Sequence, residues 1–322
     1  MKHSHPDHEH WHGNIGEPVA FDVGEPLTSA VTALDVLSWN IAIGNGRLVD
    51  VVERIRAGVF DGIKRPDARP MVILVQEAYR EDESVPEFVS SLHHGGKDPR
   101  TSRHDIVTMA DKLGMSLRYF PSMRNGRHRS DRGNAILSNV PFENAHSFAL
   151  PHVRQMRVAL AVQLKGLPGM TFACAHLDTR GRVRAGDLSG GGENAPGRAA
   201  QAAALGERLA RDGGPDQTVI IGADLNSYLG GLDPLFDGLV KAGFRRVPHW
   251  PRRSHTFHAT PLRMTLDHIL VRGTGLASIN VIRLDEDPGD RGHTIFGSDH
   301  HPLLAQIAIE PQNRGAHSAD EA

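Results

Sequence analysis

Short apolar runs alternate with amphipathic segments along most of the chain. Apolar runs of about four to eight residues favour buried strands, whereas apolar positions three and four residues apart favour helices. In residues 47–60 the apolar positions from Leu48 to Val59 fall on one helical face. The pattern predicts helices at residues 47–60, 105–114, 197–212 and 233–243, and strands at residues 34–43, 70–78, 116–122, 134–139, 156–165, 170–178, 218–226, 266–273, 279–284 and 303–310.

The order of these elements limits the fold class. Strand, helix and strand alternate in the first part of the chain, and several strands then follow one another before the next helix. Alternation favours parallel pairing with helical crossovers, whereas consecutive strands favour antiparallel pairing. The sequence therefore predicts an α/β protein with a mixed sheet, or two sheets, covered by helices.

The ends of the chain lack this periodicity. Residues 1–30 combine histidines from His3 to His12 with proline, glycine and acidic residues. We expect a disordered His-rich arm at residues 1–30, a single domain at residues 31–310 and a flexible tail at residues 311–322. Clustered histidines can bind transition metals, but a segment without fixed geometry predicts no defined metal site.

The composition narrows the range of functions. The 322-residue chain has a formal net charge of -2, so its overall charge favours neither nucleic acid nor an anionic membrane as a partner. Its single cysteine, Cys174, excludes an internal disulfide and a CxxC zinc or redox site, and we expect it in the core. The chain lacks an apolar run long enough for a transmembrane segment and an N-terminal signal peptide. We therefore expect a cytoplasmic protein.

Polar residues interrupt the apolar runs where several expected strands end. Ligand sites of α/β proteins favour the carboxyl ends of strands, so such residues can converge on one rim of a sheet. Side chains two residues apart in an extended segment share a face, which would pair His176 with Asp178 and Asp224 with Asn226. Acids that begin strands would reach the same rim if those strands run antiparallel. The residues at strand ends are Asn40, Gln76, Glu77, His176, Asp178, Asp224 and Asn226, and those at strand starts are Asp267 and Asp299.

Each interruption also has a simpler explanation. An isolated Asn or Asp at a strand end is usually a turn former or a helix cap. A stronger signal is the stretch "GADLNS" at residues 222–227, where an apolar run leads directly into Asp and Asn. Solubility does not require polar residues at that point, so we interpret the stretch as functional.

An ordered set of short motifs includes these positions: "LSWNI", "VQEAY", "RGNAILSN", "AHLD", "GADLNS", "LDHILV" and "GSDHHPL". The set resembles the endonuclease/exonuclease/phosphatase superfamily, the deoxyribonuclease-I-like proteins, over roughly residues 33–309. Each motif is weak alone, but their order is specific. The resemblance implies a four-layered α/β sandwich of two mixed β-sheets flanked by helices. It also implies hydrolysis of phosphoesters with a divalent metal, usually Mg²⁺, with Mn²⁺ as a substitute.

The resemblance also assigns roles to the motif residues. Asn40 and Glu77 match the family's metal-binding pair, and Asp299 matches a further metal-binding or site-ordering carboxylate. Oxygen ligands of this kind suit Mg²⁺, which keeps several water ligands and binds substrate phosphate.

The catalytic residues follow from the same match. Asp224 and Asn226 match the pair that orients the attacking water, and His300 matches the catalytic histidine, which Asp267 would hold in place. His176 matches a second histidine, which contacts the phosphate and protonates the leaving oxygen. Phosphoester hydrolysis needs an activated water and stabilisation of the phosphoryl and leaving oxygens, so these residue types suit the reaction. A carboxylate-oriented His300 can take or share the proton of water.

The sequence departs from the family pattern near the substrate. Deoxyribonuclease-like members place a basic residue two positions after the metal carboxylate, where this chain has Tyr79. A loop at residues 122–133 carries Arg127, Arg129 and Arg132, which we expect to bind substrate phosphate, although a solvated mobile loop explains them equally well.

Neighbouring residues complete the expected site. The motifs do not identify the acid that would orient His176, and we take Asp131 as a candidate. Adjacent strand residues point to opposite faces, so His301 should face away from the site if His300 faces it. Arg198 and Gln201 share a helical face, where a role in the site and an ordinary helix surface explain them equally well.

The leading hypothesis is a Mg²⁺-dependent phosphodiesterase or nuclease, with nucleic acid as the first expected substrate. Alternatives within the fold are a phosphomonoesterase and a sphingomyelinase-like lipid phosphodiesterase. An alternative of another class is a catalytically silent binding module, which would lack some of the site residues, and this chain lacks none of them. The sequence leaves the oligomeric state open.

Overall fold

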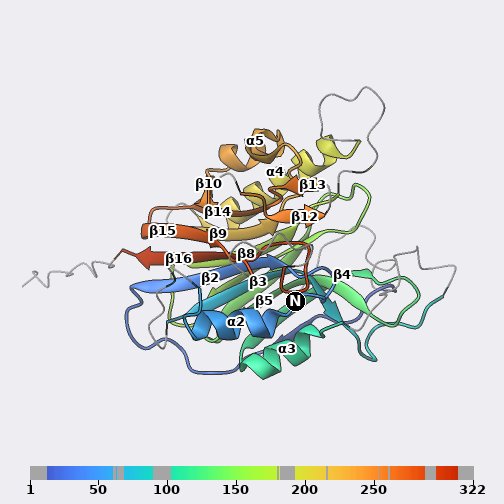
Figure 1. The fold of residues 1–322 in the computed structure, drawn as a ribbon, viewed down its shortest axis with the longest axis horizontal. Coiled ribbons are helices and arrows are strands. Elements are labelled where there is room, and N and C mark those ends of the chain that lie inside the picture. The colour runs from blue at the N-terminus through green and yellow to red at the C-terminus, as the bar shows by residue number, and fades with distance from the viewer. Residues whose placement is uncertain are drawn as a thin grey trace, which may run out of the picture.

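Two β-sheets form the centre of the molecule (Figure 1). The computed structural model describes residues 13–60, 63, 69–89, 103–179, 181, 193–214, 217–252, 254–259, 262–286 and 295–310. The first sheet contains, in spatial order, β1 (Val19–Phe21), β4 (Ser116–Arg124), β5 (Asp131–Ser138), β3 (Met71–Arg80), β2 (Ala33–Asn40), β16 (Leu303–Ile309), β15 (Leu276–Arg283) and β11 (His249–Trp250). The second sheet contains β10 (Arg245–Val247), β14 (Asp267–Arg272), β9 (Thr218–Asp224), β8 (Met170–His176), β7 (Val158–Leu164) and β6 (Phe142–Ala149). A short hairpin joins β12 (Phe257–Ala259) to β13 (Leu262–Met264).

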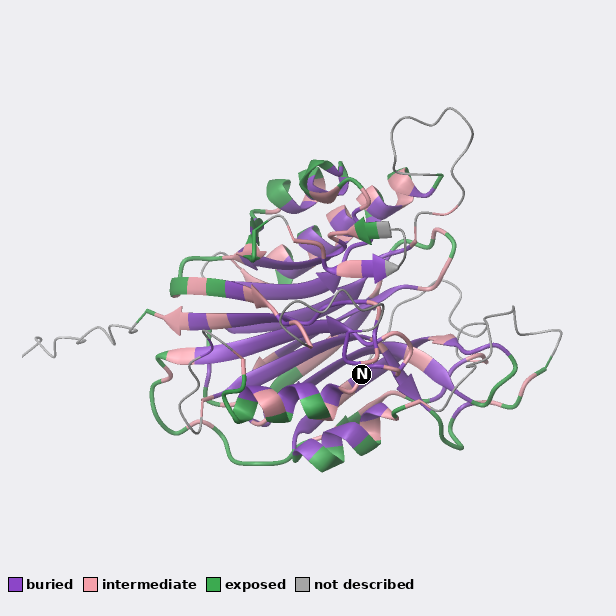
Figure 2. Ribbon diagram, viewed as in Figure 1, coloured by how far each residue is buried: buried purple, intermediate pink, exposed green. Residues whose placement is uncertain are grey.

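The helices cover the outer faces of the two sheets. Helices α2 (Leu48–Arg56) and α3 (Ile106–Leu113) pack on the first sheet, and α4 (Ala195–Gly213) and α5 (Leu235–Lys241) pack on the second. A third group of buried apolar side chains fills the space between the sheets, and it includes Cys174 as expected. Figure 2 shows the central strands buried and the outward helical faces exposed. The fold is therefore the predicted four-layered sandwich of two mixed sheets flanked by helices.

Both sheets combine parallel and antiparallel pairs. Strands β2 and β3 run parallel, as do β8 and β9, so their carboxyl ends lie at one edge. Strand β14 runs antiparallel to β9, and β16 runs antiparallel to β2. The starts of β14 and β16 therefore reach the edge where the parallel strands end, which confirms the predicted common rim.

Several boundaries differ from those predicted, and the end of helix α2 is one of them. Helix α2 ends at Arg56, and Val59, expected on its buried face, is 60% exposed. The reason is Gly58, whose φ of 66° is the left-handed conformation that ends helices.

The expected N-terminal arm also extends less far than predicted. Strand β1 pairs with β4, and Ile15 is buried, so part of residues 1–30 belongs to the domain. Residues 1–12, with the five histidines from His3 to His12, and the tail at 311–322 lie outside the described residues. None of the helices in the described part is both long enough and apolar enough to cross a membrane.

Candidate active site

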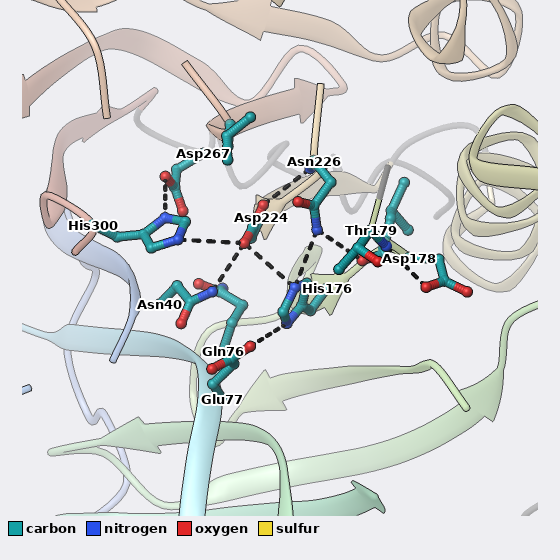
Figure 3. A network of polar contacts seen from close by, with 12 residues as sticks. Asn40, Gln76, Glu77, His176, Asp178, Thr179, Asp224, Asn226, Asp267 and His300 are labelled. Carbon is teal, nitrogen blue, oxygen red and sulfur yellow. Dashed lines mark hydrogen bonds and ion pairs between the residues drawn. The ribbon is translucent and has the colours of Figure 1, made fainter. Parts of the chain in front are cut away.

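The predicted residues meet where the two sheets expose the ends of their central strands (Figure 3). Asn40 ends β2, His176 ends β8 and Asp224 ends β9. In the second sheet Asp224 lies opposite His176 on one side and opposite Asp267, the first residue of β14, on the other. Strand register alone therefore brings three of the predicted residues together.

Asp224 is the centre of this network. Its Oδ2 accepts a hydrogen bond from Asn40 Nδ2 at 2.9 Å, and its Oδ1 accepts one from the backbone N–H of Asn226 at 3.0 Å. The Nε2 atoms of His176 and His300 lie 3.4 and 3.9 Å from Oδ2. Burial, and next the charge of Asp267, raise the pKa of Asp224 to about 7. This carboxyl can therefore exchange a proton near neutral pH.

His300 is held in one orientation by its neighbours. Its Nδ1 lies 2.8 Å from Asp267 Oδ2, and its carbonyl accepts a hydrogen bond from Trp39 Nε1 at 2.8 Å. Burial alone would lower the pKa of His300, but the charge and hydrogen bond of Asp267 outweigh it and raise this pKa to about 10. A ring protonated at neutral pH is a hydrogen-bond donor at Nε2, whereas the sequence predicted a proton-accepting role.

Glu77 reaches the site through a break in β3. The pairing of β3 with β5 shifts between Val75 and Ala78, and Glu77 has a φ of 53°, in the left-handed region. A non-glycine residue in this region stores strain, and such strain is common at functional sites. The Glu77 side chain is 24% exposed, and its Oε1 lies 4.0 Å from His176 Nδ1.

His176 lies between Glu77 and Asp224 but is not an acid at neutral pH. Burial, followed by the charges of Arg157, His300 and Arg132, holds the pKa of His176 well below its usual range. The ring is therefore neutral. This does not agree with the expectation that His176 protonates the leaving oxygen.

A cavity of about 430 Å³ opens over these residues. Its lining includes Asn40, Glu77, His176, Asp224, Asn226, Asp299 and His300. Asp299 is the most accessible of the acids there, with a side chain 45% exposed and Oδ1 3.9 Å from His300 Nε2. The sequence prediction therefore identified part of the lining of this cavity, including all of its carboxylates and histidines.

The donor atoms around the cavity fit a divalent cation. Carboxylates of Glu77, Asp224 and Asp299 face one space, and like charges this close repel one another unless a proton or a cation lies between them. Ligand atoms of Asp224, Asp267 and His300 also lie within 4.8 Å of one another, and the second oxygen of Asp267 is buried with no hydrogen-bond partner among the residues that the structure describes. The residues present therefore suit a hard metal ion.

Asp131 is not the partner of His176, so that expectation was wrong. Its carboxylate accepts hydrogen bonds from Arg80 Nε at 3.1 Å, from Tyr119 Oη at 2.7 Å and from the backbone of Gly16 at 2.8 Å. Arg80 is 1% exposed and needs a buried counter-charge, which Asp131 supplies.

This pair gives a stability prediction. Replacing Asp131 by alanine leaves the buried Arg80 charge without its main partner, so we expect a loss of about 3–5 kcal/mol in the free energy of unfolding. Urea denaturation measures it. Asp82→Ala is the control, because Asp82 faces the same Arg80 at 3.4 Å but is 40% exposed, so its loss should cost about 1 kcal/mol or less. Equal losses in both variants would contradict the prediction.

Asp178 also lies outside the site, although its spacing suggested that it would join His176. Strand β8 ends at His176, so the alternation of side chains stops there. The Asp178 carboxylate accepts hydrogen bonds from the backbone N–H groups of Arg154 at 2.7 Å and Gln155 at 2.9 Å. It therefore fixes the neighbouring loop.

His301 faces away from the site, as the alternation predicted. Its Nδ1 lies 2.8 Å from Asp285 Oδ1. Arg129 donates to the backbone oxygens of Val85 at 2.9 Å and Glu83 at 2.7 Å, and the Arg127 guanidinium lies 5.5 Å from the ring centre of Phe88. Both exposed arginines thus tie two loops together.

Arg132 lies closer to the site residues than Arg127 and Arg129 do. It lines a small pocket with Glu77, His176 and the buried Arg157. The substrate-binding role of Arg127, Arg129 and Arg132 stays a prediction.

Sequence reasoning missed several residues around the cavity. Tyr228, Thr179 and Phe257 line it, and Phe257 packs on His300 with ring centres 4.9 Å apart. Tyr228 stands two residues after Asn226, in the loop that the "GADLNS" stretch begins, so its position was the available signal. Phe257 lies outside every motif in the sequence, so no signal of this kind was available for it.

Known structures resemble the whole domain. An endonuclease/exonuclease/phosphatase family protein from Leptotrichia buccalis has a TM-score of 0.57 and 14% identity, covering 87% of this chain and 100% of that chain. D. rerio TDP2 complexed with single strand DNA product has a TM-score of 0.51 and 16% identity, covering 85% and 98%. The human nocturnin catalytic domain with bound sulfate has a TM-score of 0.52 and 16% identity, covering 91% and 97%. At these identities the likeness shows the fold.

The family assignment comes from the sequence itself. None of the curated proteins matches the chain in sequence. The profile of the Endonuclease/Exonuclease/phosphatase family, however, matches residues 37–300, a range that runs from before Asn40 to His300 and so includes the site residues described above. The chain therefore belongs to the Endonuclease/Exonuclease/phosphatase family, whose members are phosphoester hydrolases.

Proposed function

We propose that the protein is a Mg²⁺-dependent phosphodiesterase, and first of all a nuclease. One observation carries the proposal: the carboxylates of Glu77, Asp224 and Asp299 surround one cavity together with His300, whose Nδ1 lies 2.8 Å from Asp267 Oδ2. Three carboxylates beside a cationic histidine suit a substrate that is itself an anion, because a metal ion bound by the carboxylates can also bind the phosphate. Family membership supports the reaction class.

The proposed metal ligands are Asn40, Glu77 and Asp299. All three line the cavity, and Glu77 and Asp299 are the accessible acids there. A bound Mg²⁺ would neutralise phosphoryl oxygens and polarise the phosphorus–oxygen bond. Mn²⁺ accepts the same oxygen ligands, so we expect it to substitute.

The remaining site residues would act on the attacking water and on the phosphoryl group. Asp224 has a pKa near neutrality and lines the cavity, so we assign it to orient the attacking water and accept its proton, together with Asn226. His300 would donate from Nε2 to a phosphoryl oxygen while Asp267 holds Nδ1. Such a fixed donor stabilises the charge that develops in the transition state.

Nucleic acid is the proposed substrate class. The D. rerio TDP2 structure holds a single strand DNA product, and the nocturnin domain holds a sulfate, which has the shape and charge of a phosphate. In this chain Arg132 lies beside Glu77 and His176, where it can bind a flanking phosphate.

Hydrolysis assays with Mg²⁺ test the function. The panel contains plasmid DNA, single-stranded DNA, RNA, a phosphoinositide and sphingomyelin, each with the wild-type protein and with His300→Ala. We expect cleavage of a nucleic acid that falls by about 10²–10⁴-fold in the variant, because the fixed donor is lost. Cleavage of only the phosphoinositide or sphingomyelin would replace the nuclease by a lipid-directed enzyme. Metal binding without cleavage of any substrate would favour a binding module.

A further inference from the structure

A directed chain of hydrogen bonds leads from Tyr228 to His176 (Figure 3 shows its last two residues). Tyr228 Oη donates to Asn226 Oδ1 at 3.0 Å. Asn226 Nδ2 then contacts two acceptors, the carbonyl of Leu177 at 3.0 Å and His176 Nε2 at 3.2 Å. Because a carbonyl can only accept, the Leu177 contact fixes which end of the Asn226 amide is the nitrogen.

The orientation of this amide determines the tautomer of His176. An amide nitrogen only donates, so the His176 Nε2 that faces it is the acceptor and carries no proton. The other neighbour of Nε2, Asp224 Oδ2, lies further away at 3.4 Å and already accepts a hydrogen bond from Asn40 Nδ2 at 2.9 Å. The single ring proton is then on Nδ1, which faces Glu77 Oε1 at 4.0 Å.

Helix α4 holds the start of this chain in place. The guanidinium of Arg198, which is 0% exposed, lies 5.2 Å from the ring centre of Tyr228, a distance typical of a cation–π contact. One turn later Gln201 accepts from the backbone N–H of Asp178 and donates to the carbonyl of Pro151, both at 2.8 Å. The buried face of α4 therefore contacts Tyr228, the segment that follows His176 and the loop at Pro151.

We propose that Tyr228 is a positioning residue that holds His176 in the Nδ1–H tautomer through Asn226. The ring then presents its N–H on the Glu77 side of the cavity, where it can donate to a phosphoryl oxygen, and it transfers no proton. The Tyr228 hydroxyl on Oδ1 and the Leu177 carbonyl on Nδ2 together select this orientation of the Asn226 amide, and without the hydroxyl only the Leu177 contact remains to select it. The kinetic consequence depends on the proposed function, but the tautomer does not.

Nitrogen NMR of histidine tests the tautomer directly. The purified full-length protein, ¹⁵N-labelled at histidine, is measured at pH 7, and His176→Gln identifies the signal. We expect a neutral ring with the proton on Nδ1 in the wild-type protein, and a shift of population towards Nε2–H in Tyr228→Phe. Tyr119→Phe is the matched control, because it removes a buried tyrosine hydroxyl that contacts Asp131, and it should leave the His176 signal unchanged.

Kinetics supply the second readout. In Tyr228→Phe we expect kcat to fall about tenfold with little change in KM, the effect of losing one hydrogen bond, and no change in Tyr119→Phe. A wild-type His176 that is doubly protonated or protonated on Nε2 would overturn the proposal without any variant. An unchanged tautomer in a folded Tyr228→Phe would overturn the role of Tyr228, whatever its kcat. If none of the tested substrates is cleaved, the NMR result still decides the tautomer, so failure of the proposed function remains separate.

Discussion

Asp224→Asn is expected to lower turnover by about 10²–10⁴-fold without destabilising the fold. The variant keeps the size of the side chain but cannot accept a proton from water. Its effect on stability should have the opposite sign, because burial and the charge of Asp267 raise the pKa of Asp224 to about 7. A raised pKa means that the folded state disfavours the ionised form, so the charged Asp224 lowers stability progressively as pH rises from about 4 to about 7. A neutral asparagine avoids this cost, which offsets the loss of one acceptor, because its single oxygen can take only one of the hydrogen bonds from Asn40 Nδ2 and the Asn226 backbone N–H.

Two measurements on the same samples check this prediction. Turnover is measured at pH 8 on the best substrate of the panel, and thermal unfolding is measured at pH 8 without added metal. We expect Tm to stay constant or rise in Asp224→Asn while kcat collapses. Asp237→Asn, an exposed change of the same type on α5, should alter neither. A fall in Tm that parallels the loss of activity would show that Asp224 is a structural residue.

The common rim of strand ends could be predicted because it depends on local patterns. Apolar runs locate the strands, and polar residues at their ends locate Asn40, His176 and Asp224. The direction of β14 and β16 then brings Asp267 and His300 to the same edge. Both steps need only the alternation of side chains and the preference of ligand sites for strand ends.

Contacts between distant segments could not be predicted in this way. Asp131 has the right residue type for a histidine partner, but the buried Arg80 on β3 takes it, and spacing in the sequence contains no sign of that pairing. Asn226 shares the site with Asp224, yet its φ of 50° places it in a turn, so strand alternation gave the right residue for the wrong reason. The prediction that Asp178 joins His176 was wrong for the same reason, because strand β8 ends two residues before Asp178.

The proton positions depend on an even finer level of structure. The motif match identifies both His176 and His300 as catalytic histidines. The carboxylate of Asp267, however, raises the pKa of His300, so that ring is a cation, while burial and Arg157 lower the pKa of His176, so that ring is neutral. The same residue type therefore performs different chemistry at positions that lie on either side of Asp224. Only the partners of each ring, assembled by the fold, distinguish them.

Glu77→Gln should remove most of the metal affinity and, with it, about 10³-fold or more of the activity. Glu77 is the accessible acid next to Asn40 on the rim, and the bulge in β3 that turns it into the cavity makes it available to a metal ion. Glutamine keeps the shape of the side chain but donates from one end and has no charge, so it is a poor ligand for Mg²⁺.

Thermal unfolding gives a readout of metal binding that needs no substrate. A metal at 100 times its Kd stabilises the folded state by about 2.7 kcal/mol, so we expect Mg²⁺ to raise the wild-type Tm and to leave that of Glu77→Gln almost unchanged.

The control for this prediction is Glu81→Gln, four residues further along the same segment. Glu81 accepts a hydrogen bond from Tyr79 Oη at 2.7 Å and does not line the cavity, so its Mg²⁺-dependent rise in Tm should match that of the wild-type protein. An equal rise in Glu77→Gln would place the ion elsewhere, and the group formed by Asp224, Asp267 and His300 would then be the alternative. That alternative predicts its own result, because Asp267→Asn would abolish the Mg²⁺-dependent rise while Glu77→Gln preserves it. The pair of variants thus distinguishes a metal on the open, Glu77 side of the cavity from one buried beside His300.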